Sequence, residues 1–424
     1  MSNRSEVCAT QKTSVMSVSV NSLLEKKLEQ RKALHRMRKR SVLYSPQGAS
    51  VDMMSGLSEF GDLDNKTPTH CFNFCSNDYL GLANHPKLVE AFGKAAKTFG
   101  VGSGASHLVC GHSSEHHALE EELAEFTGRD RAVLFSTGYM ANLGVMSALL
   151  EKNDAVFQDK LNHASLLDGG LHSPAKLYRY AHNDMNHLEQ RLMKNEARLK
   201  LIASDGVFSM DGDIANVKTL AKISNKHNTL LMIDDAHGFG ALGERGAGVL
   251  EAQALSQEDV PILMGTLGKA FGSFGAFVCG SELVVESIIQ FARTYVYTTA
   301  LPPAVAAASR AALMLVQEEP WRREHLRFLI KTFRQGAEAL NLQLMPSDTA
   351  IQPLLVGKDQ DALALSQVLM NKGFWVSAIR PPTVAEGTAR LRFTFTANHS
   401  LHDIERLLDS LAQVRMKHSH WFES

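Results

Sequence analysis

One lysine lies among small and hydroxyl-bearing residues, in the segment 264–275 that reads MGTLGKAFGSFG. Lys269 follows the apolar run 261–264, and about 30 residues earlier the apolar run 229–233 ends at Asp234, a spacing typical of successive strand–helix–strand units. A lysine amine can form a Schiff base with an aldehyde, and a carboxylate can pair with a cationic ring nitrogen. These two groups are what pyridoxal 5'-phosphate (PLP) chemistry needs from a protein. A lysine in a glycine-rich surface loop is the structural alternative.

Several neighbouring motifs could hold the phosphate and the ring hydroxyl of such a cofactor. The turn 136–142, STGYMAN, follows an apolar run and opens a helical run. Backbone N–H groups at the start of a helix can hold a phosphate if Gly138 allows close approach, and Tyr139 can lie against a flat ring. The hydroxyls of Thr266 and Ser209 could bind phosphate or phenolate oxygens. The alternative for these residues is a local role in turns and caps.

Two histidines and Asp234 complete the predicted cofactor site. His163 follows a strand expected to end at residue 157 and can stack on a planar cofactor, although an isolated loop histidine is more often an ordinary surface residue. A carboxylate at a buried strand end needs a partner. Asp234 would keep a pyridinium nitrogen protonated, which makes the ring an electron sink, and His237 would reach the same ring edge. A buried structural salt bridge is the alternative for Asp234.

A different chemistry is suggested by His112, Glu115 and His116, which fit the H-x-x-E-H pattern of zinc proteases. Histidines four residues apart share a helix face and could bind zinc, with Glu115 as general base. His112 follows a glycine, however, so we expect it to precede the helix and break that geometry. A zinc hydrolase is kept only as an alternative, and no resident metal is predicted. The run 100–104 (GVGSG) and Lys269 fail the spacings of dinucleotide-binding and P-loop motifs, respectively.

The composition argues against several classes of protein. The 424 residues carry a formal net charge of −1 and a pI near 7.0, so long-range charge gives no support for binding nucleic acid or a membrane surface. Five cysteines without CxxC pairs argue against a disulfide framework or a four-cysteine zinc site. The N-terminus is polar, and no apolar run reaches the roughly 18 residues of a membrane helix. We therefore expect a cytoplasmic protein.

The chain is expected to divide into three parts. Residues 71–302 alternate between strand-like and helical runs, which predicts a large α/β domain with a mostly parallel central sheet and ligands beyond the carboxyl ends of its strands. Residues 303–424 predict a smaller α+β domain. Residues 1–70 form an extension with a basic amphipathic helix over 22–40, either a solvated face or a contact for an acidic acyl carrier. The expected strands are 132–135, 155–157, 199–203, 229–233, 261–264, 276–279, 351–356, 374–379 and 391–396.

Over about residues 22–415 the chain resembles the α-oxoamine synthase family of fold-type I PLP enzymes. Six blocks carry the resemblance: 75–82 (CSNDYLGL), 102–107 (GSGASH), 206–212 (GVFSMDG), 234–238 (DDAHG), 266–269 (TLGK) and 379–392 (IRPPTVAEGTARLR). The last block is similar to the branch that uses pimeloyl thioesters, rather than to 5-aminolevulinate synthase, glycine C-acetyltransferase or serine palmitoyltransferase. The resemblance implies an aspartate aminotransferase-like fold with PLP as cofactor.

The resemblance also implies a role for each site residue. Lys269 would hold PLP covalently and act as general base, Asp234 would pair with the ring nitrogen, and His163 would stack on the ring. The other cofactor contacts would come from Gly138, Tyr139 and Thr266 at the phosphate, His237 and Ser209 at the phenolate side, and Thr298 and Thr299 reaching the phosphate in the other subunit of a homodimer. Substrate contacts would come from Asn77 and Arg392 at the amino-acid carboxylate, and from His163, Arg38 and Thr383.

The implied reaction is the decarboxylative condensation of L-alanine with pimeloyl-CoA or pimeloyl-acyl-carrier protein. The sequence leaves the choice between these donors open. Another amino acid or acyl donor, and a non-catalytic PLP-fold binding protein, are the alternatives. The segment 50–69 is longer and more polar than the corresponding region of the family, which places the local hairpin in doubt.

Overall fold

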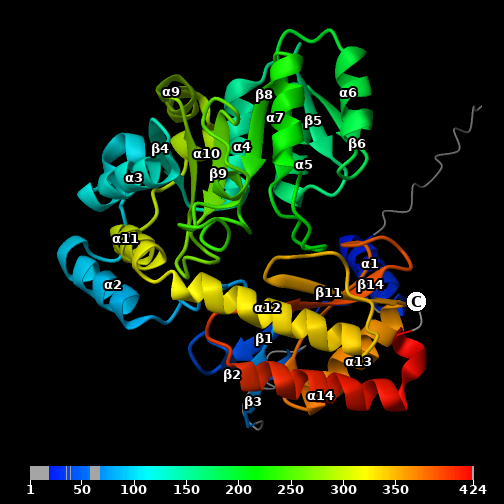
Figure 1. Cartoon of the computed structure of the whole chain (residues 1–424). Helices are drawn as coiled ribbons and strands as arrows, with labels where there is room; N and C mark the ends of the chain where they lie inside the picture. The colour runs from blue at the N-terminus through cyan, green and yellow to red at the C-terminus, as the bar shows by residue number, and fades with distance from the viewer. Residues whose placement is uncertain (1–18, 35, 39, 58–66, 423–424) are drawn as a thin grey trace, which may run out of the picture.

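The computed structural model describes residues 19–34, 36–38, 40–57 and 67–422. The chain forms two lobes (Figure 1). The upper lobe in that view contains a seven-stranded sheet with helices around it, and the lower lobe contains two smaller sheets together with the long helices α12 (Trp321–Ala339) and α14 (Leu401–Lys417). The arrangement is that of an α/β domain with a smaller α+β part.

The central sheet has the strand order β4-β10-β9-β8-β7-β5-β6. Only β10 runs antiparallel to its two neighbours, and the other adjacent pairs are parallel. The predicted mostly parallel sheet and its six expected strands are confirmed. The edge strand β6 was not expected because its sequence, KLYRY, carries the charges typical of an edge rather than an apolar run. The strands are β4 (Arg131–Phe135), β5 (Ala155–Asp159), β6 (Lys176–Tyr180), β7 (Lys200–Asp205), β8 (Leu230–Asp234), β9 (Ile262–Thr266) and β10 (Ala276–Gly280).

Helices cover both faces of this sheet, because successive side chains of a buried strand point to opposite faces. In β8, Met232 packs in one apolar cluster with Val145 and Ile288, whereas Leu231 and Ile233 pack in another with residues of α6 and α7. The helices of this lobe are α3 (Ser114–Thr127), α4 (Gly138–Leu149), α5 (Ala164–His172), α6 (Met185–Met193), α7 (Val217–Lys226), α8 (Val249–Ala252), α9 (Glu282–Phe291) and α10 (Arg293–Val296).

The smaller lobe combines the C-terminal residues with the N-terminal strands. One sheet has the order β11-β14-β13 and the other the order β1-β2-β3-β12. The expected single strand 374–379 is divided: β12 pairs with β3, whereas β13 pairs with β14. The elements are α11 (Pro303–Glu318), α13 (Asp359–Asn371), the 3-10 turn Ser419–Phe422, β1 (Arg40–Leu43), β2 (Ser50–Leu57), β3 (Thr69–Asn73), β11 (Ile351–Gly357), β12 (Phe374–Trp375), β13 (Ser377–Ile379) and β14 (Ala389–Thr394).

The hairpin that the sequence placed in doubt is formed by β2 and β3, with Val51 opposite Cys71 and Met53 opposite Thr69. Residues 58–66 between them lie outside the described residues. Because β3 also pairs with β12, the N-terminal strands extend a sheet of the C-terminal part. The proposed boundaries at residues 70 and 302 stay a prediction.

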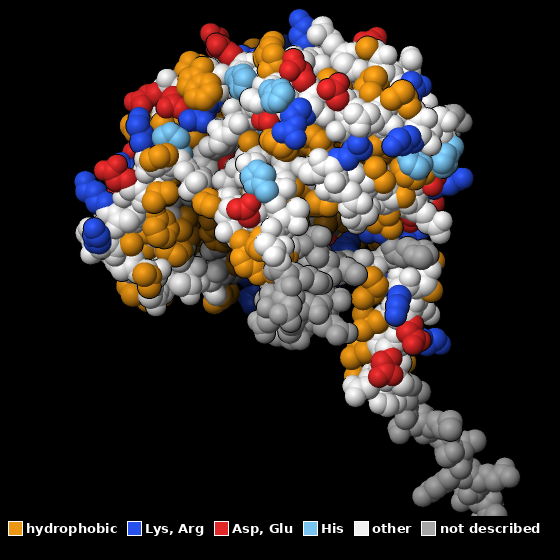
Figure 2. All heavy atoms as spheres, turned by 90° about the horizontal axis from the view of Figure 1, so that it is seen from below, with side chains coloured by type: hydrophobic (Ala, Val, Ile, Leu, Met, Phe, Trp, Pro, Cys, Tyr) orange, Lys and Arg blue, Asp and Glu red, His pale blue; other side chains and the backbone are white. Residues whose placement is uncertain are grey.

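The basic helix expected over 22–40 is shorter in the structure: α1 spans Val20–Ala33, residues 36–38 are not helical, and Arg40 begins β1. No side chain of this helix is buried: Leu23, Leu24 and Leu28 are 49%, 52% and 55% exposed. Figure 2 shows the helix projecting from the body of the molecule with apolar side chains along it. Among the described residues, no element therefore covers these apolar side chains. None of the helices in the described part of the chain has the length and hydropathy to span a membrane.

Candidate active site

Lys269 and Asp234 follow neighbouring parallel strands. Asp234 is the last residue of β8 and lies opposite Met264 of β9, and Lys269 comes three residues after β9 ends at Thr266. The carboxyl ends of parallel strands meet at one edge of a sheet, which is where α/β proteins bind their ligands. The structure therefore places both side chains at the edge that the sequence predicted.

Asp234 is held by two hydrogen bonds in an environment where it is 3% exposed. The amide Nδ2 of Asn142 donates to Asp234 Oδ2 over 2.7 Å, and the backbone N–H of Ala236 donates to Oδ1 over 3.0 Å. Asn142 belongs to α4 and is fully buried, yet sequence reasoning gave it no role. The signal that could have found it is an asparagine in an otherwise apolar helical run, since a buried amide needs partners.

His163 precedes α5 and caps its first turn. Its backbone N–H donates to Asp205 Oδ2 over 2.6 Å, and its Nδ1 lies 2.7 Å from Ser165 Oγ. Asn142 Nδ2 also donates to Ser165 Oγ over 2.8 Å, so one buried amide connects the His163 loop to Asp234. Burial lowers the pKa of His163, which favours a neutral ring. Asp205, for which no role was predicted, positions this loop.

Lys269 is half-buried. Burial lowers the pKa of its amine from the ordinary value to about 8, and the negative charges of Asp234 and Asp205 oppose that shift. An amine with this pKa becomes neutral, and so nucleophilic, at lower pH than an ordinary lysine.

His237 lies three residues beyond β8 and is 8% exposed. Burial lowers its pKa well below the usual range and raises the pKa of Tyr79 to about 12, so both groups are neutral. Tyr79 Oη lies 2.6 Å from His237 Nδ1 and 3.2 Å from Asn77 Oδ1. We assign the phenol proton to the shorter contact, which leaves the hydrogen of His237 on Nε2. Tyr79 belongs to the block 75–82, and no role was predicted for it.

Arg392 lies in β14 of the smaller lobe and reaches across to the large one. Its Nε donates to the carbonyl oxygen of Ser209 over 2.7 Å, and its Nη2 donates to Asn77 Oδ1 over 3.2 Å. Three predicted site residues from three distant segments are thus brought together. Arg392 is 7% exposed, and a buried guanidinium with this fork geometry suits a carboxylate.

The predicted phosphate-binding residues Gly138 and Tyr139 form the first turn of α4, after Thr137, whose Oγ1 accepts from Met140 N. Helix geometry leaves the first N–H groups without an intrahelical acceptor, so they can face an anion. The hydroxyl of Tyr139 contacts Asp168 Oδ2. Thr266 ends β9, and its hydroxyl donates to the carbonyl oxygen of Gly275 over 3.0 Å.

The remaining predicted residues lie elsewhere in the single chain. Thr299 is exposed and forms an isolated antiparallel bridge with Ser106, and Thr298 beside it is half-buried. No hydrogen bond among the described residues joins either threonine to Lys269 or Asp234. Arg38 and Thr383 are both exposed, and the backbone N–H of Thr383 donates to the carbonyl oxygen of Arg380.

The zinc-hydrolase arrangement of His112, Glu115 and His116 is not formed. His112 precedes α3, as expected, and Glu115 Oε2 accepts from Arg310 over 2.7 Å. His116 Nδ1 accepts from the backbone N–H of Ser113, and its Nε2 donates to the carbonyl oxygen of Leu301 over 2.7 Å. Because both ring nitrogens are occupied, His116 has no lone pair for a metal.

The residues at the carboxyl edge of the sheet fit PLP by the chemistry of their donors. A lysine with a lowered pKa can bind the aldehyde, a buried carboxylate can pair with the ring nitrogen, and a helix N-terminus can face the phosphate. His237 follows Asp234 by three residues in the sequence, and the hydrogen bonds of Ser165 and Asn142 connect the neutral imidazole of His163 to Asp234. The same edge is bordered by Arg392, which supplies a site for a substrate carboxylate.

Comparison with known proteins agrees with this fold. Residues 69–411 match the model of the aminotransferase class I and II family. A high-resolution structure of SPT with its PLP internal aldimine superposes with a TM-score of 0.87 at 27% identity, covering 95% of this chain and 100% of that one. The 8-amino-7-oxononanoate synthase of Francisella tularensis superposes with a TM-score of 0.73 at 34% identity, covering 82% of this chain and 99% of that one.

The sequence similarity is higher still among curated relatives. The chain is 61% identical over 397 residues to the 8-amino-7-oxononanoate synthase of Saccharophagus degradans, which covers 94% of this chain and 97% of that protein. At this identity and coverage, the chain belongs to the 8-amino-7-oxononanoate synthases within the aminotransferase class I and II family.

Proposed function

We propose that this protein catalyses the PLP-dependent condensation of L-alanine with a pimeloyl thioester, which yields 8-amino-7-oxononanoate, CO₂ and the free thiol for biotin biosynthesis. The observation that carries this proposal is the meeting of Lys269 and Asp234 at the carboxyl ends of β9 and β8, in a chain that is 61% identical to a curated synthase of this name.

The cofactor would be held by residues of the large lobe. Lys269 would bind it covalently, Asp234 would pair with its ring nitrogen, and the Nε2–H of His237 would donate to its ring oxygen, with Ser209 on the same side. The first turn of α4 would receive the phosphate through Gly138, Tyr139 and the hydroxyl of Thr266. The imidazole of His163, which its lowered pKa keeps neutral, would stack on the ring. When bound, PLP supplies an electron sink for the α-carbon of the amino acid.

The chain's own residues orient the amino acid and move its proton. Arg392 would receive the carboxylate of alanine, and Asn77 Oδ1 orients the guanidinium by accepting from Nη2. Lys269 Nζ, released from its covalent bond when alanine binds, would take the proton from the α-carbon and later return one. The lowered pKa of Lys269 suits a base that works near neutral pH.

The acyl donor would approach along a basic surface. Arg38 and Thr383 border Arg380, whose pKa is lowered by burial and by the positive charges of Arg36 and Arg38, while Asp359 opposes the shift. Arg36 belongs to the basic segment that the sequence connected with the acyl donor, whereas no role was predicted for Arg380. Pimeloyl-CoA and pimeloyl-acyl-carrier protein both carry phosphate, so either donor would be attracted to this group of arginines.

A homodimer would complete the site, and we place the enzyme in the cytoplasm. The exposed leucines of α1 and the exposed Thr299 support a second copy of the chain, because no residue in the described part of one chain covers them. Thr298 and Thr299 would then reach the cofactor phosphate of the other subunit. No nucleic acid or membrane partner is proposed.

The test is a titration of the purified, PLP-loaded protein with alanine, glycine and serine in turn, followed by ultraviolet–visible absorbance. Alanine should change the cofactor band at the lowest concentration, and a pimeloyl thioester should then yield 8-amino-7-oxononanoate. A lower half-saturation for glycine or serine would instead indicate another α-oxoamine synthase, and no spectral change with any of them would indicate a non-catalytic PLP-binding protein.

A further inference from the structure

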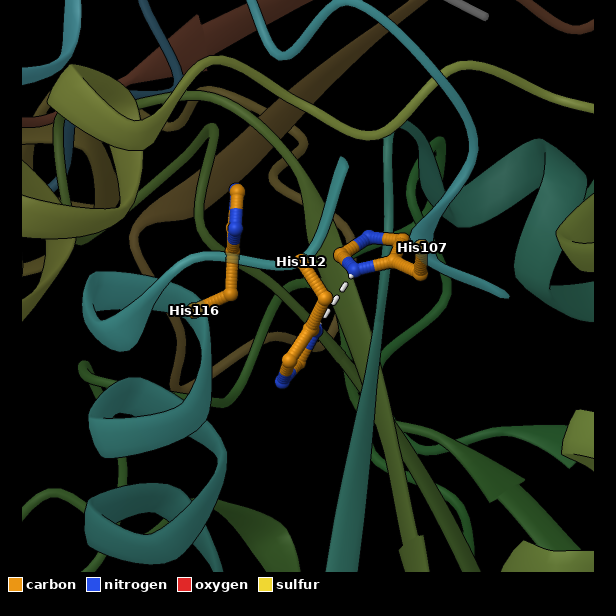
Figure 3. A group of neighbouring side chains, drawn as sticks. All are labelled: His107, His112 and His116. Carbon is orange, nitrogen blue, oxygen red and sulfur yellow. Dashed lines mark hydrogen bonds between the residues drawn. The ribbon is translucent and has the colours of Figure 1, made fainter. Parts of the chain in front are cut away.

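A group of histidines lies beside α3, apart from the residues proposed to bind PLP. Figure 3 shows His107 and His112 facing each other across a hydrogen bond, and His116 on the first turn of α3. Two sets of side chains could each hold a metal ion, because the potential ligand atoms within each set lie within 4.8 Å of one another. The first set is His107, His112 and His116, and the second is His112, His117 and Glu120. An open pocket of about 390 Å³ borders His107, His112, His117 and Glu120.

The first set cannot bind a metal as it stands. His116 uses Nδ1 to accept from Ser113 N and Nε2 to donate to Leu301 O, at 3.0 Å and 2.7 Å. His107 uses Nδ1 for its contact with His112. A metal there would have to break two hydrogen bonds of a buried histidine, each of which otherwise satisfies a polar group.

The second set has its binding atoms in reach of one another and of the pocket. His117 and Glu120 are three residues apart on α3, so they share one helix face. His112 Nε2 lies 3.9 Å from Glu120 Oε2, and the side chain of Glu120 is only 16% exposed. Within the described residues no lysine or arginine forms an ion pair with Glu120. Burial raises the pKa of Glu120 and so favours a proton on its carboxyl group, and a cation at this position would take the place of that proton.

Two further contacts orient these groups. The backbone N–H of Leu134 donates to Glu120 Oε1 over 3.0 Å, and the other carboxyl oxygen, Oε2, is directed toward His112. His107 Nδ1 and His112 Nδ1 are 2.8 Å apart, so one of them must carry the hydrogen. If His112 donates, its Nε2 presents a lone pair to the second set, and His107 acts as the acceptor that fixes this tautomer. The ring of His107 is held by stacking on Tyr295 at 5.2 Å and 8°.

We propose that His112, His117 and Glu120 bind a divalent transition-metal ion, Zn²⁺, with water from the pocket as the fourth ligand. Two imidazoles and one carboxylate are ligands that Zn²⁺ accepts, at bond lengths of about 2.0–2.2 Å. The three groups must draw together to reach these distances. The side chain of His117 is 67% exposed, contacts Glu121 at 3.4 Å and meets the ring of His112 edge-on at 5.8 Å, so it can turn toward the ion at little cost.

The test is isothermal titration calorimetry of the full-length, PLP-loaded protein with ZnCl₂, in the absence of amino acids. We expect one Zn²⁺ per chain. His117→Ala and Glu120→Gln should each weaken binding at least tenfold, and the second change keeps the oxygen that accepts from Leu134 N. His107→Phe keeps an aromatic ring beside Tyr295 but removes the acceptor for His112, so it should weaken binding by about 10–100-fold.

Two controls separate this site from adventitious binding. His402→Ala alters another exposed histidine with a glutamate three residues away, at 3.8 Å from Glu405, but without a third ligand, and should leave the affinity unchanged. Cys110→Ser removes an exposed thiol two residues before His112 and should also leave the affinity for Zn²⁺ unchanged. The proposal is overturned if His117→Ala and Glu120→Gln bind Zn²⁺ as the unchanged protein does, or if Cys110→Ser alone removes the binding.

Discussion

Asn142 Nδ2 donates hydrogen bonds to Asp234 Oδ2 and to Ser165 Oγ, over 2.7 Å and 2.8 Å. The two acceptors come from segments that lie 92 and 23 residues away in the sequence. Since Ser165 Oγ in turn contacts His163 Nδ1, the amide fixes the position of the proposed ring-nitrogen partner relative to the proposed stacking residue. We therefore expect Asn142 to act as a positioning residue, through Asp234 and Ser165.

Replacing Asn142 with alanine should weaken cofactor retention. A hydrogen bond to a charged group contributes about 1.5–3 kcal/mol, so the dissociation constant of PLP should rise roughly 10- to 100-fold. The measurement is equilibrium binding of PLP to the apoenzyme. Asn153→Ala, at an exposed position, is the control and should leave the constant unchanged. Equal PLP affinity in the Asn142 variant would show that Asp234 needs no support from α4.

Lys269→Ala should abolish turnover and the borohydride-stable attachment of the cofactor, because no other amine is proposed to hold it. The check is mass spectrometry of borohydride-treated protein, together with an assay of product formation. Lys222→Ala, at an exposed position of α7, should retain both properties. A borohydride label that persists in the Lys269 variant would assign the covalent bond to a different lysine.

The rate at which PLP attaches to the apoenzyme should depend on pH through the Lys269 amine. Burial lowers the pKa of this amine to about 8 from an ordinary 10.5, and only the neutral amine attacks an aldehyde. The rate should therefore rise as pH increases toward 8 and level off above it. Stopped-flow absorbance over pH 6 to 10 measures the profile. A rate that keeps rising to pH 10 would mean that the amine titrates as an exposed lysine does.

Arg392→Ala should mainly raise the KM for alanine, with a smaller effect on the KM for the acyl donor. Truncating one partner of a buried charge pair costs about 2–5 kcal/mol, which corresponds to a rise of at least 30-fold. Arg392→Lys keeps the charge but loses the planar fork, so its KM for alanine should lie between that of the unchanged protein and that of Arg392→Ala. Steady-state kinetics with each substrate varied in turn is the measurement. Unchanged saturation by alanine would place the substrate carboxylate elsewhere.

His182 should make stability depend on pH. Burial lowers the pKa of His182, but hydrogen bonds to Asp159 at 3.0 Å and Asp213 at 2.9 Å raise it more strongly, to about 10. A raised pKa in the folded state contributes stability that is fully present below the unfolded value of about 6.5 and is lost as pH rises through about 10.

The difference in Tm between the unchanged protein and His182→Ala should therefore be largest near pH 6 and shrink toward pH 10. Thermal unfolding followed by circular dichroism across that range measures it. His402→Ala, on the exposed side of α14, serves as the matched histidine control and should show no such trend. A difference that is constant with pH would mean that His182 contributes through packing rather than charge.

The strands of the large lobe could be predicted because each is a short apolar run between turn residues, and burial on both faces of a parallel sheet requires such runs. The same rule missed β6, whose edge position permits lysine and arginine. It also treated 374–379 as one strand, although β12 and β13 pair with different sheets. Pairing partners far apart in the sequence decide that division, and a local pattern does not contain them.

For the site, the residue types and their places after strands were sufficient to single out Lys269, Asp234, His163 and His237. The roles of the supporting side chains could not be predicted from the local sequence. Tyr79 meets His237 across 158 residues, and Asn142 meets Asp234 across 92. Each is an ordinary residue of its own segment and gains its role only through a distant neighbour.

The sequence by itself determined which groups with the required chemistry this protein carries and that they follow the strands of an α/β sheet, because motif spacing and apolar periodicity are local properties of the chain. Only the tertiary structure decided how those groups are protonated, oriented and connected, since desolvation and hydrogen bonding depend on which distant side chains are packed together. The lowered pKa of Lys269, the neutral His237 and the amide of Asn142 between Asp234 and Ser165 all arise from that packing.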